Sequence, residues 1–190
     1  KILLHLSAFP ILWIENGSAE GVSVETDHPE KTGADRALTA LAWGSLYGGA
    51  PAVIIDAGTA VTVDAVSPEG VLLGGWMAPG WEALKSSLSA AAPELPDGSS
   101  ESVSSPWARE TVQALGGGIE TLYRAGIAAL HSRVQSGLKA SAEVEVVTVL
   151  TGGDAHRLQS DFPAAQVIPG LILDGLELAL ERVDSEQGKG

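Results

Sequence analysis

A short apolar run that ends in an aspartate and a glycine constrains this chain more than any other part of its sequence. Residues 52–55 (Ala-Val-Ile-Ile) are apolar on both faces of an extended strand, which is typical of a strand buried inside a sheet. Asp56 follows directly, and Gly58 lets backbone N–H groups approach an anion. Thr59 and Thr62 add hydroxyl donors. The pattern predicts a site for phosphate and a metal ion. The alternative is that the aspartate and the glycine only form a turn, which would have the same sequence.

The rest of the sequence alternates between strand-like and helical patterns, which indicates an α/β fold. The turn at 67–70 (Ser-Pro-Glu-Gly) predicts a β-hairpin, and the run 74–80 (GGWMAPG) is expected to break the regular structure after it. The expected helices are 34–47, 81–91, 107–134 and 171–183, with a loop at 92–106. The expected strands are 2–6, 11–14, 21–25, three strands joined by turns within 52–73, and 144–150. Three consecutive glycines at 116–118 predict a bend or a close helix contact, because glycine weakens an isolated helix.

Composition narrows the classes of function. The net charge of −13 opposes binding to nucleic acid or to an anionic membrane, and small-molecule chemistry fits better. The chain has no cysteine, so disulfides and thiolate zinc sites are excluded and a cytoplasmic location is expected. The sequence contains neither a convincing membrane span nor a signal peptide. Because it begins at Lys1 and not at Met, we expect further residues upstream of this sequence, in the gene or before processing.

Aromatic and histidine side chains receive structural roles. Large aromatic rings bury well and dominate interfaces, so four tryptophans are expected to anchor the core or an interface rather than stack on a ligand. They are Trp43, Trp76, Trp81 and Trp107. The histidines show no metal-ligand spacing and are assigned no catalytic role; they are His5, His28, His131 and His156.

Four short motifs, each containing glycine, follow one another along the chain. They are Gly33-Ala34-Asp35-Arg36, Asp56-Ala57-Gly58-Thr59-Ala60, the run 74–80, and Thr151-Gly152-Gly153. Together with residues 169–176 (PGLILDGL), this set resembles the type III pantothenate kinases, which belong to the acetate and sugar kinase, Hsp70 and actin superfamily. The resemblance covers roughly 29–180 and implies an actin-like ATPase (ribonuclease H-like) kinase fold, a mixed β-sheet flanked by helices. It divides the chain into a remnant of a reduced first lobe (1–32), a second-lobe kinase-like domain (33–183) and a flexible tail (184–190).

The resemblance also implies an activity, the ATP-dependent phosphorylation of pantothenate in coenzyme A biosynthesis. Asp35 corresponds to the general base, and Gly33 and Arg36 correspond to substrate-binding residues. A carboxylate that only stabilises a helix N-terminus is the alternative reading of Asp35. Thr111 matches a threonine that contacts pantothenate from the neighbouring subunit, and an ordinary helix threonine is the alternative there.

The nucleotide and its cations are expected at the remaining motif residues. Asp56 is expected to hold a cation, Mg²⁺ or a monovalent K⁺ or NH₄⁺, beside the ATP phosphates. Residues that match the family's ATP-binding positions are Gly58, Thr59, Gly152 and Gly153. We expect a homodimer, or a heteromer with a related kinase subunit, in which the helix 107–134 packs across the interface.

The sequence departs from the family pattern in its first part. Family members open on an N-terminal strand with Asp-x-Gly-Asn/Thr, the first of two phosphate loops, and the segment of this sequence before Gly33 has no such motif. Thr26 also stands where the family usually has a substrate-contacting tyrosine. Two hypotheses remain open: an active kinase whose first lobe lies upstream of Lys1 or on a partner chain, and a non-catalytic subunit that stabilises or regulates a complete kinase.

Overall fold

The computed structural model describes residues 14–18, 22–96, 105–141 and 145–187. A five-stranded sheet lies at the centre of the described part, in the order β3-β2-β1-β4-β5. Its strands are β1 (Ala52–Ala57), β2 (Ala60–Val66), β3 (Leu72–Pro79), β4 (Val147–Thr151) and β5 (Gln166–Val167). The first three strands are antiparallel neighbours, whereas β4 pairs in parallel with both β1 and β5. This mixed sheet confirms the predicted α/β, ribonuclease H-like arrangement.

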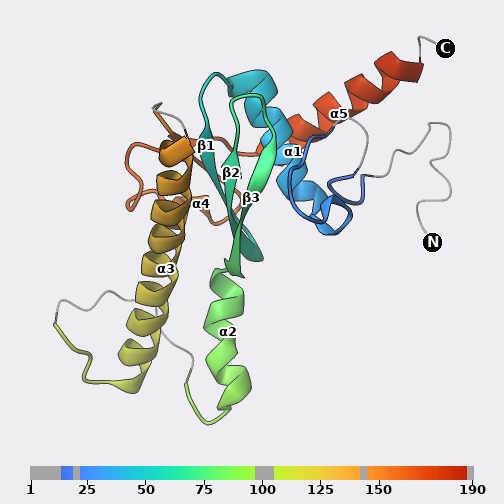
Figure 1. The fold of residues 1–190 in the computed structure, drawn as a ribbon. Coiled ribbons are helices and arrows are strands. Elements are labelled where there is room, and N and C mark those ends of the chain that lie inside the picture. Colours follow the sequence, from blue (N-terminus) through green and yellow to red (C-terminus); the bar gives the residue numbers. More distant parts are fainter. Residues whose placement is uncertain (1–13, 19–21, 97–104, 142–144, 188–190) are drawn as a thin grey trace, which may run out of the picture.

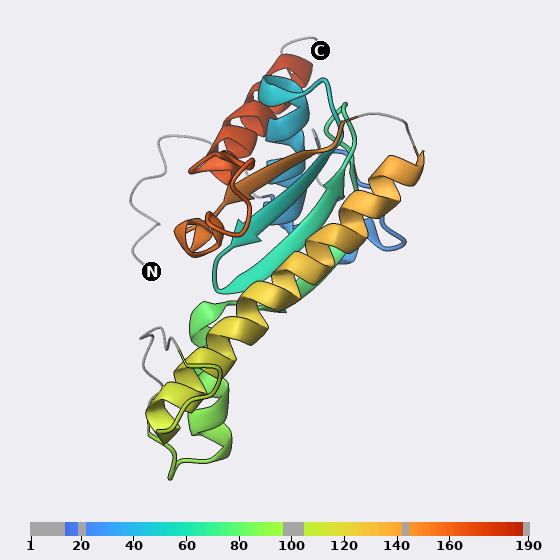
Figure 2. The same cartoon turned by 90° about the vertical axis from the view of Figure 1, so that its left-hand side faces the viewer.

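Helices cover both faces of the sheet (Figure 1). They are α1 (Ala34–Ala42), α2 (Trp81–Ala91), α3 (Thr111–Ser141), α4 (Ala155–Leu158) and α5 (Leu171–Gln187). A short 3-10 helix (Pro29–Lys31) precedes α1, and a π-helical turn (Trp43–Tyr47) continues it. The long helix α3 lies along one face of the sheet, and α1 with α5 lies along the other (Figures 1 and 2). No helix in the described ranges is long and apolar enough to cross a membrane.

The two faces of β1 pack in two separate cores, because successive side chains of a strand point to opposite faces. Val53 and Ile55 are fully buried in a cluster with the inner face of α3, including Ile127. Ile54 is fully buried in the second cluster, where it meets Trp43 at the end of α1. The face that carries Ile54 also carries Asp56, so this aspartate points to the side of the sheet on which α1 lies.

Helix α2 and the first part of α3 extend beyond the sheet as a two-helix arm (Figures 1 and 2). The arm keeps large apolar side chains in solvent, since Leu122 is 68% exposed and Trp107, just before α3, is 65% exposed. Trp107 and Trp76 therefore do not anchor the core of this chain, whereas Trp43 and Trp81 are buried as predicted.

The prediction that the run 74–80 breaks the regular structure is wrong, because β3 runs through Leu72–Pro79. Its two glycines have structural reasons to be there. Gly74 has φ +139° at the point where the register between β2 and β3 shifts. A Cβ at Gly75 would collide with the Asp64 carboxylate and would lie 2.5 Å from the carbonyl oxygen of Val63.

Several helices and strands have bounds that differ from the predicted ones. The helix expected at 107–134 begins at Thr111 and continues to Ser141, and the last helix extends to Gln187. The α3 helix is continuous through its glycines, and a Cβ at Gly117 or Gly118 would meet nothing within 4 Å, so no close contact with the described residues explains these two glycines. The strands expected at 2–6 and 11–14 fall outside the described residues except for position 14, which is not in a strand. Residues 22–25 form one isolated bridge, from Val24 to Leu72, in place of the strand expected at 21–25.

Candidate active site

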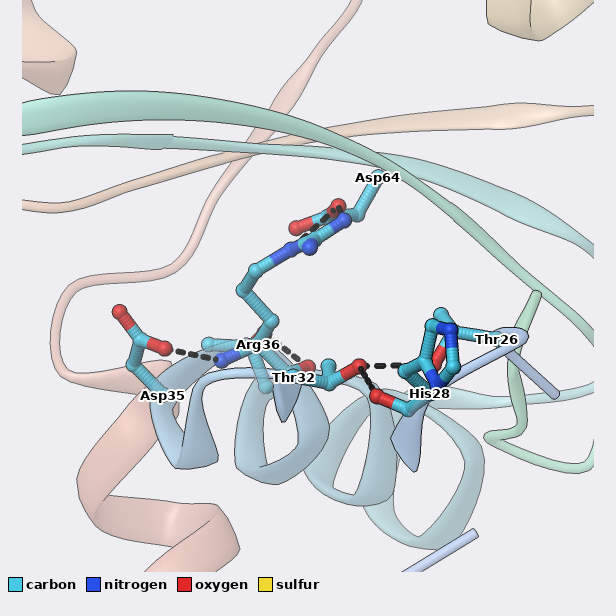
Figure 3. Close-up of polar contacts among 7 residues, drawn as sticks. Thr26, His28, Thr32, Asp35, Arg36 and Asp64 are labelled. Atoms are coloured by element: carbon cyan, nitrogen blue, oxygen red, sulfur yellow. Dashed lines mark hydrogen bonds and ion pairs between the residues drawn. The ribbon is translucent and has the colours of Figure 1, made fainter. Parts of the chain in front are cut away.

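The first turn of α1 presents the predicted base and its neighbouring arginine (Figure 3). Gly33 is the N-cap of this helix, and a Cβ there would collide with the Asp35 carboxylate. The Asp35 carboxylate is exposed, and its Oδ1 accepts a hydrogen bond of 2.9 Å from the backbone N–H of Arg36. Gly33 therefore leaves the space in which an accessible carboxylate stands at a helix N-terminus, where the helix dipole favours negative charge.

Arg36 turns from α1 toward the sheet and pairs with Asp64 on β2 (Figure 3). Its Nε donates to Asp64 Oδ1 at 2.9 Å, and its Nη2 donates to the same oxygen. The arginine side chain is 13% exposed and the aspartate side chain 1% exposed. Hydrogen bonds between two ionised groups are about twice as strong as neutral ones, so this buried ion pair fixes the arginine firmly to the sheet.

Asp64 receives no role in the sequence analysis. The available signal was alternation within β2. Thr62 and Asp64 are polar and alternate with the apolar Val61 and Val63, which is the pattern of a strand with one polar face. The register puts this polar face beside Asp56, because Thr62 is its direct partner on β1.

Asp56 stands at the end of β1 in an acidic environment. Burial raises its pKa, and the negative charges of Asp35 and Asp64 raise the pKa further. Burial also raises the pKa of Asp64, while the Arg36 guanidinium acts in the opposite direction. Three carboxylates thus influence one another around one guanidinium, and the excess of negative charge favours a cation.

The residues present can supply part of a cation site. No group of three or more His, Asp or Glu side chains in the described part of the chain is arranged to hold a metal ion. Asp56 is a single half-buried carboxylate. Mg²⁺ in phosphoryl-transfer enzymes is commonly bound by one or two carboxylates together with substrate phosphates and water. Asp56 fits a cation that arrives with a nucleotide, and not one held by the protein alone.

The glycines of the Thr151-Gly152-Gly153 motif meet the end of β1. Gly152 has φ +88°, and a Cβ there would collide with the Asp56 carboxylate and would lie 2.7 Å from the carbonyl carbon of Ala57. The backbone N–H of Asp154 donates to the Ala57 carbonyl at 2.9 Å. Gly152 is therefore required by the close approach of two chain segments, whereas a Cβ at Gly153 would meet nothing within 4 Å, which leaves open space on that side of the backbone.

The loop between β1 and β2 holds the predicted phosphate residues. The backbone N–H of Gly58 donates to Ala60, and the carbonyl of Thr59 accepts from the N–H of Gly80. Thr59 is exposed. This loop and Gly152 lie at the carboxyl ends of β1 and β4, which are adjacent parallel strands. Ligands of open α/β sheets bind at this edge, so the arrangement suits a phosphate compound.

Most of the predicted site residues come together and one does not. The residues near the carboxyl end of β1 or the first turn of α1 are Gly33, Asp35, Arg36, Asp56, Gly58, Thr59, Gly152 and Gly153. Thr111 begins α3 at the far end of the two-helix arm, well separated from α1 (Figure 1). In a single chain Thr111 cannot contact a ligand held between Asp35 and Asp56.

The sheet order and the acidic site at its edge define an α/β protein of the actin-like ATPase class. Comparison with known proteins is more specific. A family model described as "Type III pantothenate kinase" matches residues 1–133. The type III pantothenate kinase of Thermobifida fusca is 35% identical over 179 residues, which cover 94% of this chain and 69% of the relative. That of Streptomyces griseus is 35% identical over 177 residues, which cover 91% and 65%.

The chain belongs to the type III pantothenate kinase family, and it spans about two thirds of the length of these relatives. A crystal structure of a conserved Baf family protein from Campylobacter jejuni superposes with a TM-score of 0.54. The two chains are 23% identical, and the match covers 78% of this chain and 65% of the other. At this identity the likeness supports the fold alone.

Proposed function

We propose that this chain catalyses the transfer of the γ-phosphoryl group of ATP to the primary hydroxyl of pantothenate, in coenzyme A biosynthesis in the cytoplasm. The observation that carries the proposal is the acidic site itself. An exposed carboxylate, Asp35, stands at a helix N-terminus close enough to Asp56 for its charge to raise the pKa of Asp56. A chain with a purely structural role has no physical need for this arrangement.

In the proposed reaction Asp35 accepts the proton of the attacking hydroxyl while that oxygen bonds to the γ-phosphorus. The bond between the γ-phosphorus and the bridging oxygen breaks, and ADP leaves with that oxygen. Gly33 keeps the space around Asp35 open, and Arg36 directs N–H groups at the substrate.

The nucleotide is proposed to lie at the carboxyl ends of β1 and β4. Gly58 and Thr59 contact its phosphates, and the open space at Gly153, next to Gly152, accepts the adenosine. Mg²⁺, with K⁺ or NH₄⁺ as a monovalent cation, would be held by Asp56 and the phosphates, and supplies positive charge against the charge on the transferred group.

Two substitutions test the assignment. In the assembly that shows pantothenate-dependent ATP consumption, Asp35→Asn should lower kcat by about two to four orders of magnitude, because a positioned base contributes about that much. Pantothenate binding should change less. Asp56→Asn should instead raise the concentration of cation needed for half-maximal rate. Asp161→Asn serves as a control, since Asp161 pairs with Arg124 on the α3 side of the molecule. Wild-type kinetics in both site variants would refute the catalytic roles.

The second candidate is a non-catalytic subunit that binds a complete kinase of the same family. It is favoured by the exposed apolar side chains of the arm. In that case Asp35→Asn would leave activity of the complex unchanged, whereas a charged residue in place of Leu122 would abolish it.

Both candidates include an oligomer formed through the arm, either a homodimer or a heteromer with a related subunit. Exposed apolar patches of this kind mark interaction surfaces. A dimer would also bring Thr111 of one subunit within reach of the substrate site of the other. Light scattering at micromolar concentration should show a dimer that Leu122→Asp dissociates. Leu173→Asp is the matched control, because Leu173 is 66% exposed on α5, away from the arm. A monomeric wild-type protein would contradict the homodimer.

A further inference from the structure

We infer that Asp64 is a positioning residue for the reaction: it holds the Arg36 guanidinium in the one orientation in which that group serves the substrate and leaves Asp35 free. The inference rests on the proposed function for the identity of the substrate. The contact by which Asp64 fixes Arg36 can be tested without assuming that function.

The contact geometry fixes one edge of the guanidinium and leaves another available. Nε and Nη2 of Arg36 both donate to a single oxygen, Asp64 Oδ1. Nη1 donates to no residue in the described part of the chain. The arginine therefore reaches the site as an oriented donor whose charge is already balanced, and not as a freely moving cation.

The sheet in turn fixes Asp64. Its side chain is 1% exposed, and its backbone lies between Ile54 of β1 and Gly75 of β3. Any side chain at Gly75 would collide with the oxygen that holds Arg36. The glycine on β3 is thus part of the same arrangement, because it provides the space in which the Asp64 carboxylate lies.

Electrostatics explain why such a partner is needed. Arg36 follows Asp35 directly in α1, and the charges of Asp35 and Asp64 both act on Asp56. Among the described residues Asp64 is the only acidic side chain that pairs with the guanidinium, and Asp35 is the immediate chain neighbour of Arg36. An arginine paired with Asp35 would neutralise the carboxylate that has to accept the proton. Asp64 prevents this by binding the guanidinium from the sheet side.

Kinetics give the first test. Asp64→Asn should raise the KM for pantothenate at least tenfold and leave the KM for ATP unchanged, the size expected when one charge-assisted hydrogen bond to the substrate is lost. It should also shift the pH dependence of kcat, because Arg36 is released toward Asp35. In an Arg36→Met background the same change should have no further effect on the KM, since coupled residues are not additive. Additive effects of the two substitutions would overturn the inference.

Asp161→Asn is a matched control for this test. Arg124 uses the same two donors, Nε and Nη2, on Asp161 Oδ1 at 3.1 and 2.9 Å, and its Nε also lies 2.9 Å from Asp161 Oδ2. This substitution should move neither KM. Should Asp64→Asn fail to fold, Arg36→Lys takes its place, because lysine keeps the charge and cannot make both hydrogen bonds.

The second readout does not depend on activity. In the wild-type protein the Nε–H resonance of Arg36, assigned by its loss in Arg36→Lys, should be protected from exchange with water. Asp64→Asn should remove that protection and leave the Arg124 resonance unchanged. Asp161→Asn should remove the protection of the Arg124 Nε–H and leave the Arg36 resonance unchanged. An unprotected Arg36 signal in the wild type would overturn the inference. A protected signal in a protein that never consumes ATP with pantothenate would refute the proposed function, yet the hold of Asp64 on Arg36 would stand.

Discussion

Replacement of Gly175 by alanine should loosen the contact that carries the active-site helix. Gly175 lies on the face of α5 that packs against α1, and a Cβ there would collide with the carbonyl oxygen of Leu38. It would also lie 2.6 Å from the carbonyl carbon and 3.0 Å from the Cα of Leu38, both backbone atoms, so no side-chain rotation relieves the overlap. The two helices have to separate, and α1 carries Asp35 and Arg36 at its first turn.

Two contributions decide how far the free energy of unfolding changes. Overpacking of a well-packed core lowers it by about 1–3 kcal/mol, and the higher helix propensity of alanine offsets up to about 1 kcal/mol of this loss. We expect a net loss near 1–2 kcal/mol, so the melting temperature should fall by roughly 2–8 °C for a protein of this size. The KM for pantothenate should rise in the same variant, because the Arg36–Asp64 contact depends on the position of α1.

Thermal unfolding followed by circular dichroism measures the first effect. Gly126→Ala is the control, because Gly126 is an exposed glycine within α3 whose added Cβ would meet nothing within 4 Å. This control should be stabilised by up to about 1 kcal/mol. If both alanine variants were stabilised alike, α5 would not lie against α1 as described, and the reasoning would be refuted.

Two further predictions follow from the buried polar groups. The pKa of Asp56 is raised in the folded protein, so its protonated form favours folding and its contribution to stability is lost as the pH rises. Asp56→Asn should therefore melt at a higher temperature than wild type at pH 7 and at the same temperature below about pH 4, where the unfolded aspartate is also protonated; a lower melting temperature at pH 7 would contradict this. Tyr123 has a buried hydroxyl without a partner among the described residues, and burial raises its pKa to about 12. Tyr123→Phe should unfold at an equal or higher denaturant concentration and should remove the tyrosine absorbance change that occurs last in an alkaline titration; a clear loss of stability would indicate a hidden partner.

Local sequence patterns were sufficient for most of the fold. The apolar residues 52–55 predicted a buried strand, and α2 was predicted with its observed bounds because a glycine precedes Trp81 and apolar residues recur at helical spacing. The run 74–80 was wrongly predicted to break the strand, because glycines usually interrupt strands. The reason for Gly75 lies on another strand. A collision between residues distant in the sequence cannot be read from either segment alone.

The site was predictable in its residue types and not in its pairings. The motifs gave the positions of Asp35 and Asp56, and the fold brings them together. The sequence offered Arg36 as a fixed cation for the substrate and named no partner that would fix it; the structure pairs it with Asp64, which is 28 residues away. Only the register of β2 determines that Asp64 points toward α1, because a shift by one residue would move it to the opposite face.

The outer edge of β3 has a consequence for how this molecule can associate. An exposed strand edge invites another chain to extend the sheet, which leads to aggregation. Here the backbone of Leu72 already pairs with residues 23 and 25, and an irregularity in register with a positive φ at Gly74 bends the strand next to that point. Pro79, which has no N–H to donate, ends it. The regular edge of β3 that a second molecule could continue is therefore confined to residues 75–78, a stretch shorter than the whole strand, which limits strand pairing between copies.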